Sequence, residues 1–255
     1  MRKTSITSSP NTINTTTSAT NRSKRIMFQQ LYELFTFLFK YVQSILYNKQ
    51  QQTPANNSNS TKSSTHNSIA LQYYKGKTLV LDLDETLVHS VRLGTTETKV
   101  NPSIKKTIEV TNDRQSILYE VYKRPHVDFF LSTISKWYKV VIFTASMSEY
   151  ADPVIDWLDQ DHSYISQRYF RQSCILKDGN FLKDISIAES DLSKVCLIDN
   201  SPAAFALYQE NAIPLPTWIS NPKDDCLLDL LPLLDALRFT ADVRSILSLR
   251  DSNQI

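Results

Sequence analysis

The sequence predicts an α/β domain in which a parallel β-sheet is flanked by helices. Three apolar runs end in polar side chains: residues 78–84 (TLVLDLD), 139–146 (KVVIFTAS) and 195–201 (VCLIDNS). Because Val, Leu and Ile follow one another in these runs without alternation, each strand is expected to be buried on both faces, as in a parallel sheet. Helical patterns lie between and after the runs, an order that is typical of doubly wound α/β folds.

Helix signals occur in three segments: residues 124–138 (RPHVDFFLSTISKWY), 201–210 (SPAAFALYQE) and 221–237 (NPKDDCLLDLLPLLDAL). Pro125 suits the first turn of the first helix. Ser201 can cap the second helix, with Pro202 at its first helical position. Pro232 is expected to kink or divide the third helix, because proline lacks the N–H that a helical hydrogen bond needs.

Two antiparallel insertions are expected in addition to the parallel strands. Residues 98–123 contain TIEV and SILYEVYK, and residues 168–184 (RYFRQSCILKDGNFLKD) place Lys-Asp-Gly where a hairpin turn belongs. Ligands of open α/β sheets bind beyond the carboxyl ends of the strands. We therefore expect the three polar strand ends to converge on one site and both insertions to border it.

Charge and polarity divide the chain into unlike parts. Residues 1–68 hold eight of the 28 Lys and Arg residues and only one of the 26 acids, Glu33, so this part is basic and the remainder is mildly acidic. The Ser, Thr, Asn and Gln tracts at 1–25 and 48–70 bury too little apolar surface to offset the entropy lost on ordering. We expect a disordered basic tail over 1–25, a disordered linker over 48–70 and one globular domain over 71–250.

Residues 26–47 (IMFQQLYELFTFLFKYVQSILY) have the pattern of an amphipathic helix. Polar residues, among them Glu33 and Lys40, fall within one arc of a helical wheel, and apolar and aromatic residues cover the opposite side. Basic residues flank the segment on both sides. This combination predicts a helix that lies in a membrane interface.

Three alternatives for residues 26–47 stay open. A spanning helix has about the right length, but each charged side chain near the bilayer centre would cost roughly 2.5 to 3.5 kcal/mol. A mitochondrial transit peptide fits the acid-poor, Ser-rich start of the chain. The helix could also dock on its own domain or on a partner, although the long polar linker argues against docking on its own domain.

The composition argues against several classes of function. The chain has only three glycines, so it contains no glycine-rich phosphate loop. Its three cysteines, Cys174, Cys196 and Cys226, cannot complete a disulfide framework and lack CxxC spacing, which favours a reducing compartment and argues against zinc. The acidic domain has no basic, aromatic-rich face, so we expect no nucleic-acid partner.

The strongest chemical signal is a pair of carboxylates at the end of a core strand. Asp82 and Asp84 are two residues apart, so in extended backbone their side chains point the same way. Close carboxylates repel each other unless a cation or a proton lies between them. Mg²⁺ prefers oxygen ligands and keeps several waters, and the other strand ends supply further oxygens in Thr144, Asp199 and Asn200.

Each of these residues also has a simpler interpretation. An EF-hand would need glycine and glutamate where the chain has Leu87 and Leu93. Thr144 could merely cap the following helix. Lys183 could be a surface residue of the hairpin, and Asp199 and Asn200 could form a turn. The cysteines lack a base partner in a recognisable motif, which argues against a cysteine-phosphatase mechanism.

Four motifs, DLDETLVHS, FTASMSEYADPV, FLKDIS and LIDNSP, resemble in order and wording those of haloacid-dehalogenase superfamily phosphatases. The resemblance covers about residues 76–250 and is to the branch that dephosphorylates the C-terminal domain (CTD) of RNA polymerase II. KRPHVDFF, RYFRQSC, NAIP and the run LLPLLDALRFTADVRSIL look most like the nuclear-envelope members of Dullard type. The resemblance implies a Rossmann-like fold of the haloacid-dehalogenase type with a small antiparallel β insertion.

The resemblance also implies a role for each matching residue. Asp82 would be the nucleophile that forms an aspartyl phosphate, and Asp84 the general acid and base. Thr144 and Lys183 would bind and neutralise the phosphoryl group. A Mg²⁺ ion would be held by Asp82, Asp84 through its backbone carbonyl, Asn200 and nearby Asp199. Arg171 would be a further phosphate or substrate contact.

The expected function is therefore a Mg²⁺-dependent protein Ser/Thr phosphatase on the endoplasmic reticulum or nuclear envelope, with its domain facing cytosol or nucleoplasm. The resemblance implies a lipin-type phosphatidate phosphatase as substrate, hence control of lipid synthesis, and a small membrane regulatory subunit as partner. One alternative is a soluble nuclear phosphatase of the polymerase CTD, and another is a non-catalytic scaffold that binds phosphoproteins. The nucleus and the mitochondrion remain alternative locations.

Overall fold

The computed structural model describes residues 76–94, 104–112 and 115–249. All of them belong to one structural unit. The predicted tail at 1–25, helix at 26–47 and linker at 48–70 lie outside the described residues and stay predictions. Among the helices in the described ranges, none is both long and apolar enough to cross a bilayer.

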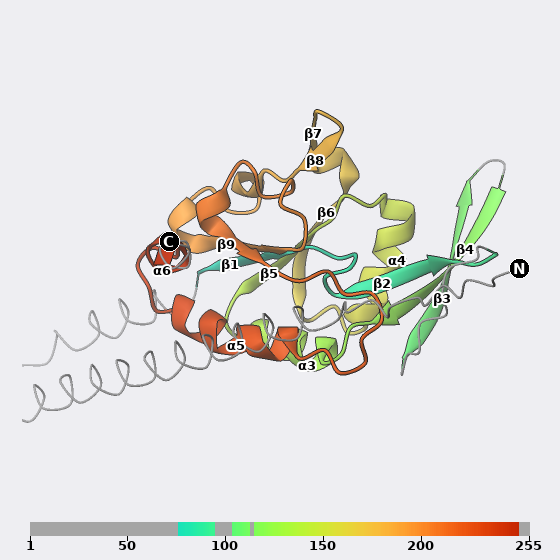
Figure 1. Cartoon of the computed structure of the whole chain (residues 1–255), viewed down its shortest axis with the longest axis horizontal. Helices are drawn as coiled ribbons and strands as arrows, with labels where there is room; N and C mark the ends of the chain where they lie inside the picture. Colours follow the sequence, from blue (N-terminus) through green and yellow to red (C-terminus); the bar gives the residue numbers. More distant parts are fainter. Residues whose placement is uncertain (1–75, 95–103, 113–114, 250–255) are drawn as a thin grey trace, which may run out of the picture. The chain divides into compact units, whose positions relative to one another are not determined.

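A five-stranded parallel sheet forms the centre of the domain (Figure 1). Its order is β10-β9-β1-β5-β6, with β1 (Thr78–Leu81), β5 (Lys139–Phe143), β6 (Ile165–Tyr169), β9 (Val195–Asp199) and β10 (Ala212–Pro214). The three apolar runs are its three inner strands, and β1 pairs in parallel with both β5 and β9. Every residue of β1 and β9 is buried, which confirms that these strands are covered on both faces.

The two faces of the sheet pack against different kinds of structure. Leu79, Leu81 and their neighbours on one face join the larger core with α3 (Val127–Ile134), α4 (Ser148–Leu158) and α5 (Cys226–Leu237). Val80 and its neighbours on the other face pack against Ile185 and Ala188, in and just after the 3₁₀ helix η2 (Ile185–Ile187). The remaining short helices are η1 (Arg171–Ser173), η3 (Leu192–Lys194), η4 (Gln209–Asn211) and α6 (Arg244–Leu247).

Two helix predictions need correction. Residues 202–207 form successive turns rather than an α-helix, and the 3₁₀ helix η4 follows at 209–211. The carbonyl of Ala204 accepts the backbone N–H of Lys183 at 2.9 Å, which is a tertiary contact in place of a helical one. The third helix starts at Cys226 rather than near residue 221, and it runs through Pro232 without division.

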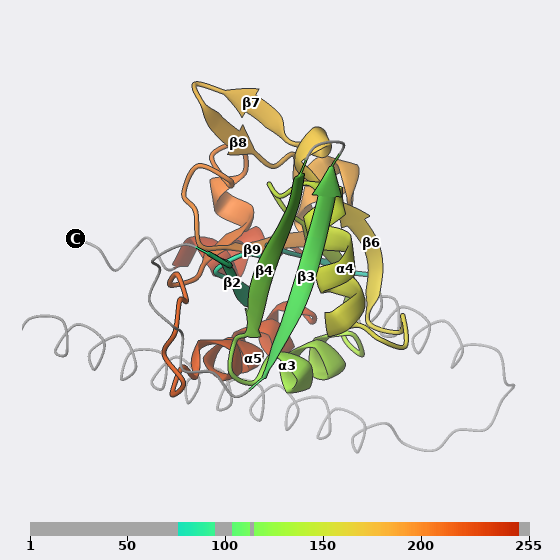
Figure 2. The ribbon, with the colours of Figure 1, turned by 90° about the vertical axis from the view of Figure 1, so that its right-hand side faces the viewer.

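Both antiparallel insertions are present (Figure 2). The first is a three-stranded sheet of order β2-β4-β3, from β2 (Val88–Arg92), β3 (Lys105–Asn112) and β4 (Gln115–Lys123). The second is the hairpin of β7 (Ile175–Lys177) and β8 (Asn180–Leu182). Its turn residues Asp178 and Gly179 have φ of 51° and 77°, as a type I′ turn requires, and glycine adopts this conformation at no steric cost.

Candidate active site

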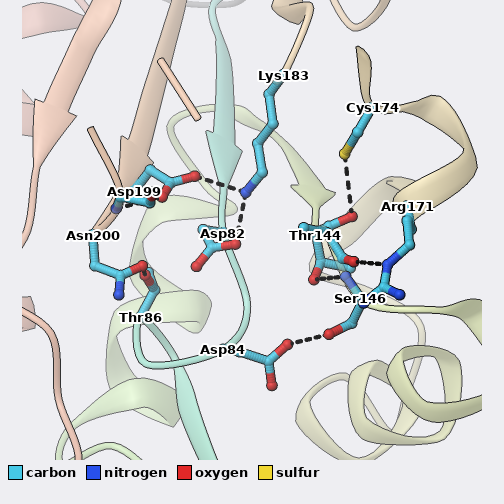
Figure 3. Close-up of polar contacts among 12 residues, drawn as sticks. Asp82, Asp84, Thr86, Thr144, Ser146, Arg171, Cys174, Lys183, Asp199 and Asn200 are labelled. Carbon is cyan, nitrogen blue, oxygen red and sulfur yellow. Dashed lines mark hydrogen bonds and ion pairs between the residues drawn. The ribbon is translucent and has the colours of Figure 1, made fainter. Parts of the chain in front are cut away.

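The polar ends of β1, β5 and β9 lie around one cavity of about 690 Å³. Asp82, Thr144 and Asp199 line it from the three strand ends (Figure 3). Val110 and Tyr119 of the three-stranded sheet and Gly179 to Phe181 of the hairpin complete the wall. The prediction that the strand ends converge and that both insertions border the site is confirmed.

Lys183 joins two carboxylates at the floor of the cavity. Its Nζ donates to Oδ1 of Asp82 at 2.6 Å and to Oδ2 of Asp199 at 2.7 Å. The exposed fractions of the three residues are 7% for Asp82, 2% for Lys183 and 1% for Asp199, so water screens these charges little. Burial alone would lower the pKa of Lys183, but the two carboxylates outweigh it and raise that pKa, so the ammonium keeps its charge.

Asp199 is held in place from both ends of its carboxylate. Besides the Lys183 contact at Oδ2, Oδ1 accepts the backbone N–H of Ser201 at 2.8 Å. Burial and the neighbouring Asp82 carboxylate raise the pKa of Asp199, because one ammonium is shared between two negative charges. An additional cation beside this pair would therefore be attracted.

Asp84 has a different environment from Asp82. Its Oδ2 accepts the Ser146 hydroxyl at 2.7 Å, and its Oδ1 accepts the Tyr150 hydroxyl at 2.8 Å. Both donors are neutral, and burial raises the pKa of Asp84 to about 6, with Asp82 adding to the shift. A carboxyl group with this pKa can give and take a proton near neutral pH.

The loop that carries Asp84 turns back sharply at the next residue. Glu85 has a φ of 56°, in the left-handed region that residues with a Cβ seldom adopt. Its N–H donates to Val88 at 2.7 Å and its carbonyl accepts from Trp218 at 2.9 Å, and these bonds hold the turn. Glu85 thus shapes the loop after the two carboxylates.

Thr144 is 1% exposed and points its hydroxyl toward the other site residues (Figure 3). Its Oγ1 accepts the backbone N–H of Ser146 at 3.0 Å, which leaves the hydroxyl proton able to donate to a ligand. It does not cap α4, whose cap position is Met147, so the simpler interpretation of Thr144 is wrong.

Arg171 lines the mouth of the cavity. Its Nε donates to the carbonyl of Ala145 at 2.5 Å, and its guanidinium lies 5.0 Å from the ring centre of Phe181 on β8. Cys174 follows one turn later and its Sγ lies 3.8 Å from the Thr144 carbonyl oxygen. Arg171 is thus placed to meet an anionic ligand that enters the cavity.

The oxygen groups beside Lys183 fit a Mg²⁺ ion. Asn200 lines the cavity next to Asp82, with Thr86 donating to its Oδ1 at 3.4 Å and its Nδ2 donating to Thr217 at 3.1 Å. In the part of the chain that the structure describes, Asp82 uses Oδ1 for Lys183 and no protein donor reaches its Oδ2. The same part holds no group of three or more His, Cys, Asp or Glu side chains arranged as a metal cage. Mg²⁺ does not need one, because it is commonly held by one or two carboxylates and completes its shell with water.

Two contacts of Asp84 were missing from the sequence interpretation. Ser146 and Tyr150 lie within the FTASMSEYADPV motif but received no role there. The sequence did contain a signal for them, because Ala151, Val154, Ile155 and Leu158 have the spacing of a buried helix face. The resulting helix, α4, places Tyr150 in its first turn.

A family model described as NLI interacting factor-like phosphatase matches residues 77–244. The chain belongs to this phosphatase family. The predictions of an enzyme, of a phosphatase of this branch and of the haloacid-dehalogenase fold class are thereby confirmed. The match argues against a non-catalytic scaffold.

Curated relatives of the phosphatase have high identity. A "CTD nuclear envelope phosphatase 1 homolog" of Caenorhabditis elegans is 52% identical over 176 residues, covering 68% of this chain and 72% of the relative. "CTD nuclear envelope phosphatase 1" of Xenopus tropicalis is 49% identical over 180 residues, with coverage of 70% and 74%. "Nuclear envelope morphology protein 1" of Schizosaccharomyces pombe is 51% identical over 175 residues, with coverage of 68% and 36%.

Among solved structures, the phosphatase is similar to "The Structure of Fcp1, an essential RNA polymerase II CTD phosphatase". The identity is 17% and the TM-score is 0.49, with 74% of this chain and 56% of the other covered.

Proposed function

We propose that the protein is a Mg²⁺-dependent protein Ser/Thr phosphatase that works through an aspartyl phosphate. The contrast between Asp82 and Asp84 carries this proposal. Asp82 is paired with a buried ammonium. Among the described residues, the Asp84 side chain is hydrogen-bonded by neutral hydroxyls alone, and burial raises its pKa to about 6. Two carboxyl groups with such different surroundings suit different tasks, one as nucleophile and the other as acid and base.

In the first step a carboxylate oxygen of Asp82 attacks phosphorus and the bond from phosphorus to the Ser or Thr oxygen breaks. Asp84 gives its proton to the departing oxygen, so a neutral alcohol leaves. In the second step the Asp84 carboxylate takes a proton from water as the water oxygen attacks the same phosphorus. The bond to Asp82 breaks, and inorganic phosphate leaves.

Other side chains of the cavity would stabilise the charge that moves in these steps. Lys183 donates to Asp82 and can also contact a phosphoryl oxygen. Thr144 can donate its hydroxyl, and Arg171 can bind the phosphate or the flanking chain. Asp82, the backbone carbonyl of Asp84 and Asn200 would hold Mg²⁺, with Asp199 behind them. When bound, the ion would offset the negative charge of the phosphoryl group.

The proposed location is the nuclear envelope and the endoplasmic reticulum. The relatives are named as nuclear-envelope proteins, which supports the same location here. Residues 26–47 would attach the chain to the membrane by lying in its interface. We further propose a lipin-type phosphatidate phosphatase as substrate, so that the enzyme regulates lipid synthesis, and a small membrane protein as regulatory subunit.

Phosphate release from lipin-like and polymerase-heptad phosphopeptides tests the reaction. The full chain should release phosphate in the presence of Mg²⁺, and this release should stop when a chelator removes the metal. The Asp82→Asn variant should fold but release no phosphate. Asp161→Asn, at an exposed aspartate outside the cavity, is the matched control and should keep full activity. Turnover by the Asp82→Asn variant would refute the nucleophile, and a strong preference for heptad peptides would favour a polymerase phosphatase.

Membrane attachment is tested separately by fractionation. Deletion of residues 26–47 should release the protein from membranes while its activity on soluble phosphopeptides remains. If the shortened chain still sediments with membranes, the anchor lies elsewhere.

A further inference from the structure

Arg124 is a fully buried arginine that does not line the active-site cavity. It lies between the end of β4 and the start of α3, with a side-chain exposure of 0% in its ion pair with Asp224. Its Nε and one terminal nitrogen donate to the two Asp224 oxygens at 2.7 and 3.1 Å. This pairing neutralises the charge of Arg124. Its remaining hydrogen bonds go to uncharged backbone carbonyls, so they serve to hold backbone segments in place.

The rest of the guanidinium joins two loops that are distant in the sequence. Nη1 donates to the carbonyl of Thr86 at 3.1 Å, and Nη2 donates to the carbonyl of Pro216 at 3.2 Å. Thr86 lies in the loop after β1 and Pro216 follows β10. One planar side chain therefore fixes the distance between these two backbones.

The two loops have one further feature in common. Thr86 donates its hydroxyl to Oδ1 of Asn200, and Thr217, the neighbour of Pro216, accepts a hydrogen bond from Nδ2 of Asn200. Both the oxygen and the nitrogen of the Asn200 carboxamide are thus hydrogen-bonded. The backbones of the two loops that supply these bonds are in turn hydrogen-bonded to Arg124.

We propose that Arg124 is a positioning residue that aims the Asn200 oxygen at the metal. The inference rests on the proposed function, because Asn200 is there a Mg²⁺ ligand. A lysine could keep the charge beside Asp224, but it lacks the planar fork that reaches Asp224 and both carbonyls together. Groups that orient a metal ligand typically change metal affinity by about 10-fold to 100-fold when they are removed.

The test measures metal binding without turnover. Mn²⁺ binding to the full chain is followed by EPR and reversed with Mg²⁺, in wild type, Arg124→Lys, Thr217→Val and Thr217→Ser. Arg124→Lys and Thr217→Val should each weaken binding, by roughly 10-fold or more for the arginine. Thr217→Ser keeps the hydroxyl and should bind as the wild type does.

Two further measurements separate positioning from folding. The melting temperature in chelator reports the fold alone, and Thr217 is exposed, so its variants are expected to fold even if Arg124→Lys does not. In the double variant the two losses of affinity should not add, because both act through Asn200. Additive losses, or unchanged metal affinity in Thr217→Val, would overturn the inference.

The outcomes distinguish this inference from the proposed function. Weakened metal binding in the variants, together with a wild type that binds metal but releases no phosphate, would support the positioning role and refute the phosphatase mechanism. Mg²⁺-dependent turnover with unchanged metal affinity in both variants would do the reverse.

Discussion

The hydroxyl of Tyr150, from the first turn of α4, lies 2.8 Å from Oδ1 of Asp84. Together with Ser146 it holds the Asp84 carboxylate at the side of the cavity opposite Lys183 (Figure 3). A neutral hydroxyl on α4 therefore helps to orient the proposed acid and base.

Tyr150→Phe should lower kcat by about 10-fold, because one of the two hydroxyls that orient Asp84 is lost while the nucleophile and its lysine are untouched. The Mg²⁺ concentration for half-maximal activity should stay the same. Steady-state kinetics over a Mg²⁺ series measures both quantities. Tyr169→Phe removes a hydroxyl that bonds the Ile187 carbonyl outside the cavity, and it should behave as the wild type.

Asp84→Asn should abolish turnover and yet stabilise the metal-free fold at neutral pH. The pKa of Asp84 is raised from 3.8 to about 6, so the folded state binds the Asp84 proton more tightly than the unfolded state does. The stability gained from this proton is present below about pH 4 and is lost as the pH rises through about 6. The variant should therefore gain about 3 kcal/mol over the wild type at pH 7.5 and less than about 1 kcal/mol at pH 4. Urea unfolding in chelator at both pH values measures this, and an equal difference at the two would contradict it.

Lys183→Met should lower the free energy of unfolding by about 3 to 5 kcal/mol in chelator, because two buried carboxylates lose their shared ammonium. Adding Asp82→Asn should restore part of the loss, since one of the two repelling charges is then removed. Chemical denaturation followed by circular dichroism measures both. Lys194→Met, at an exposed lysine paired with Asp191, is the control and should change stability little.

The inner strands of the sheet were predictable because burial on both faces leaves an uninterrupted apolar run, as in β1 and β9. The edge strands were not. β6 is ISQRY with exposed residues in its middle, and β10 has three residues of which one is proline. An edge strand needs less apolar sequence, so its signal is correspondingly weak.

The sequence predicts those site residues that stand at the end of a strand or after a turn. Asp82, Thr144 and Asp199 share one edge of the sheet by topology alone, and this convergence holds in the structure. The Lys183 contacts depend on how the hairpin folds back, and the grip of Arg124 on Thr86 spans 38 residues. Such long-range contacts have no local pattern, so they appear only once the chain is folded.

The hairpin of β7 and β8 has an open tip and a fixed base. Its tip, at Asp178 and Gly179, has space around it, since a Cβ added at Gly179 would meet no atom within 4 Å. Its base is fixed, because the N–H of Lys183 bonds Ala204 and the ammonium is held by two carboxylates. The two turn residues still need their positive φ, but a longer tip would change what meets the mouth of the cavity while the contacts of Lys183 beneath it stay intact.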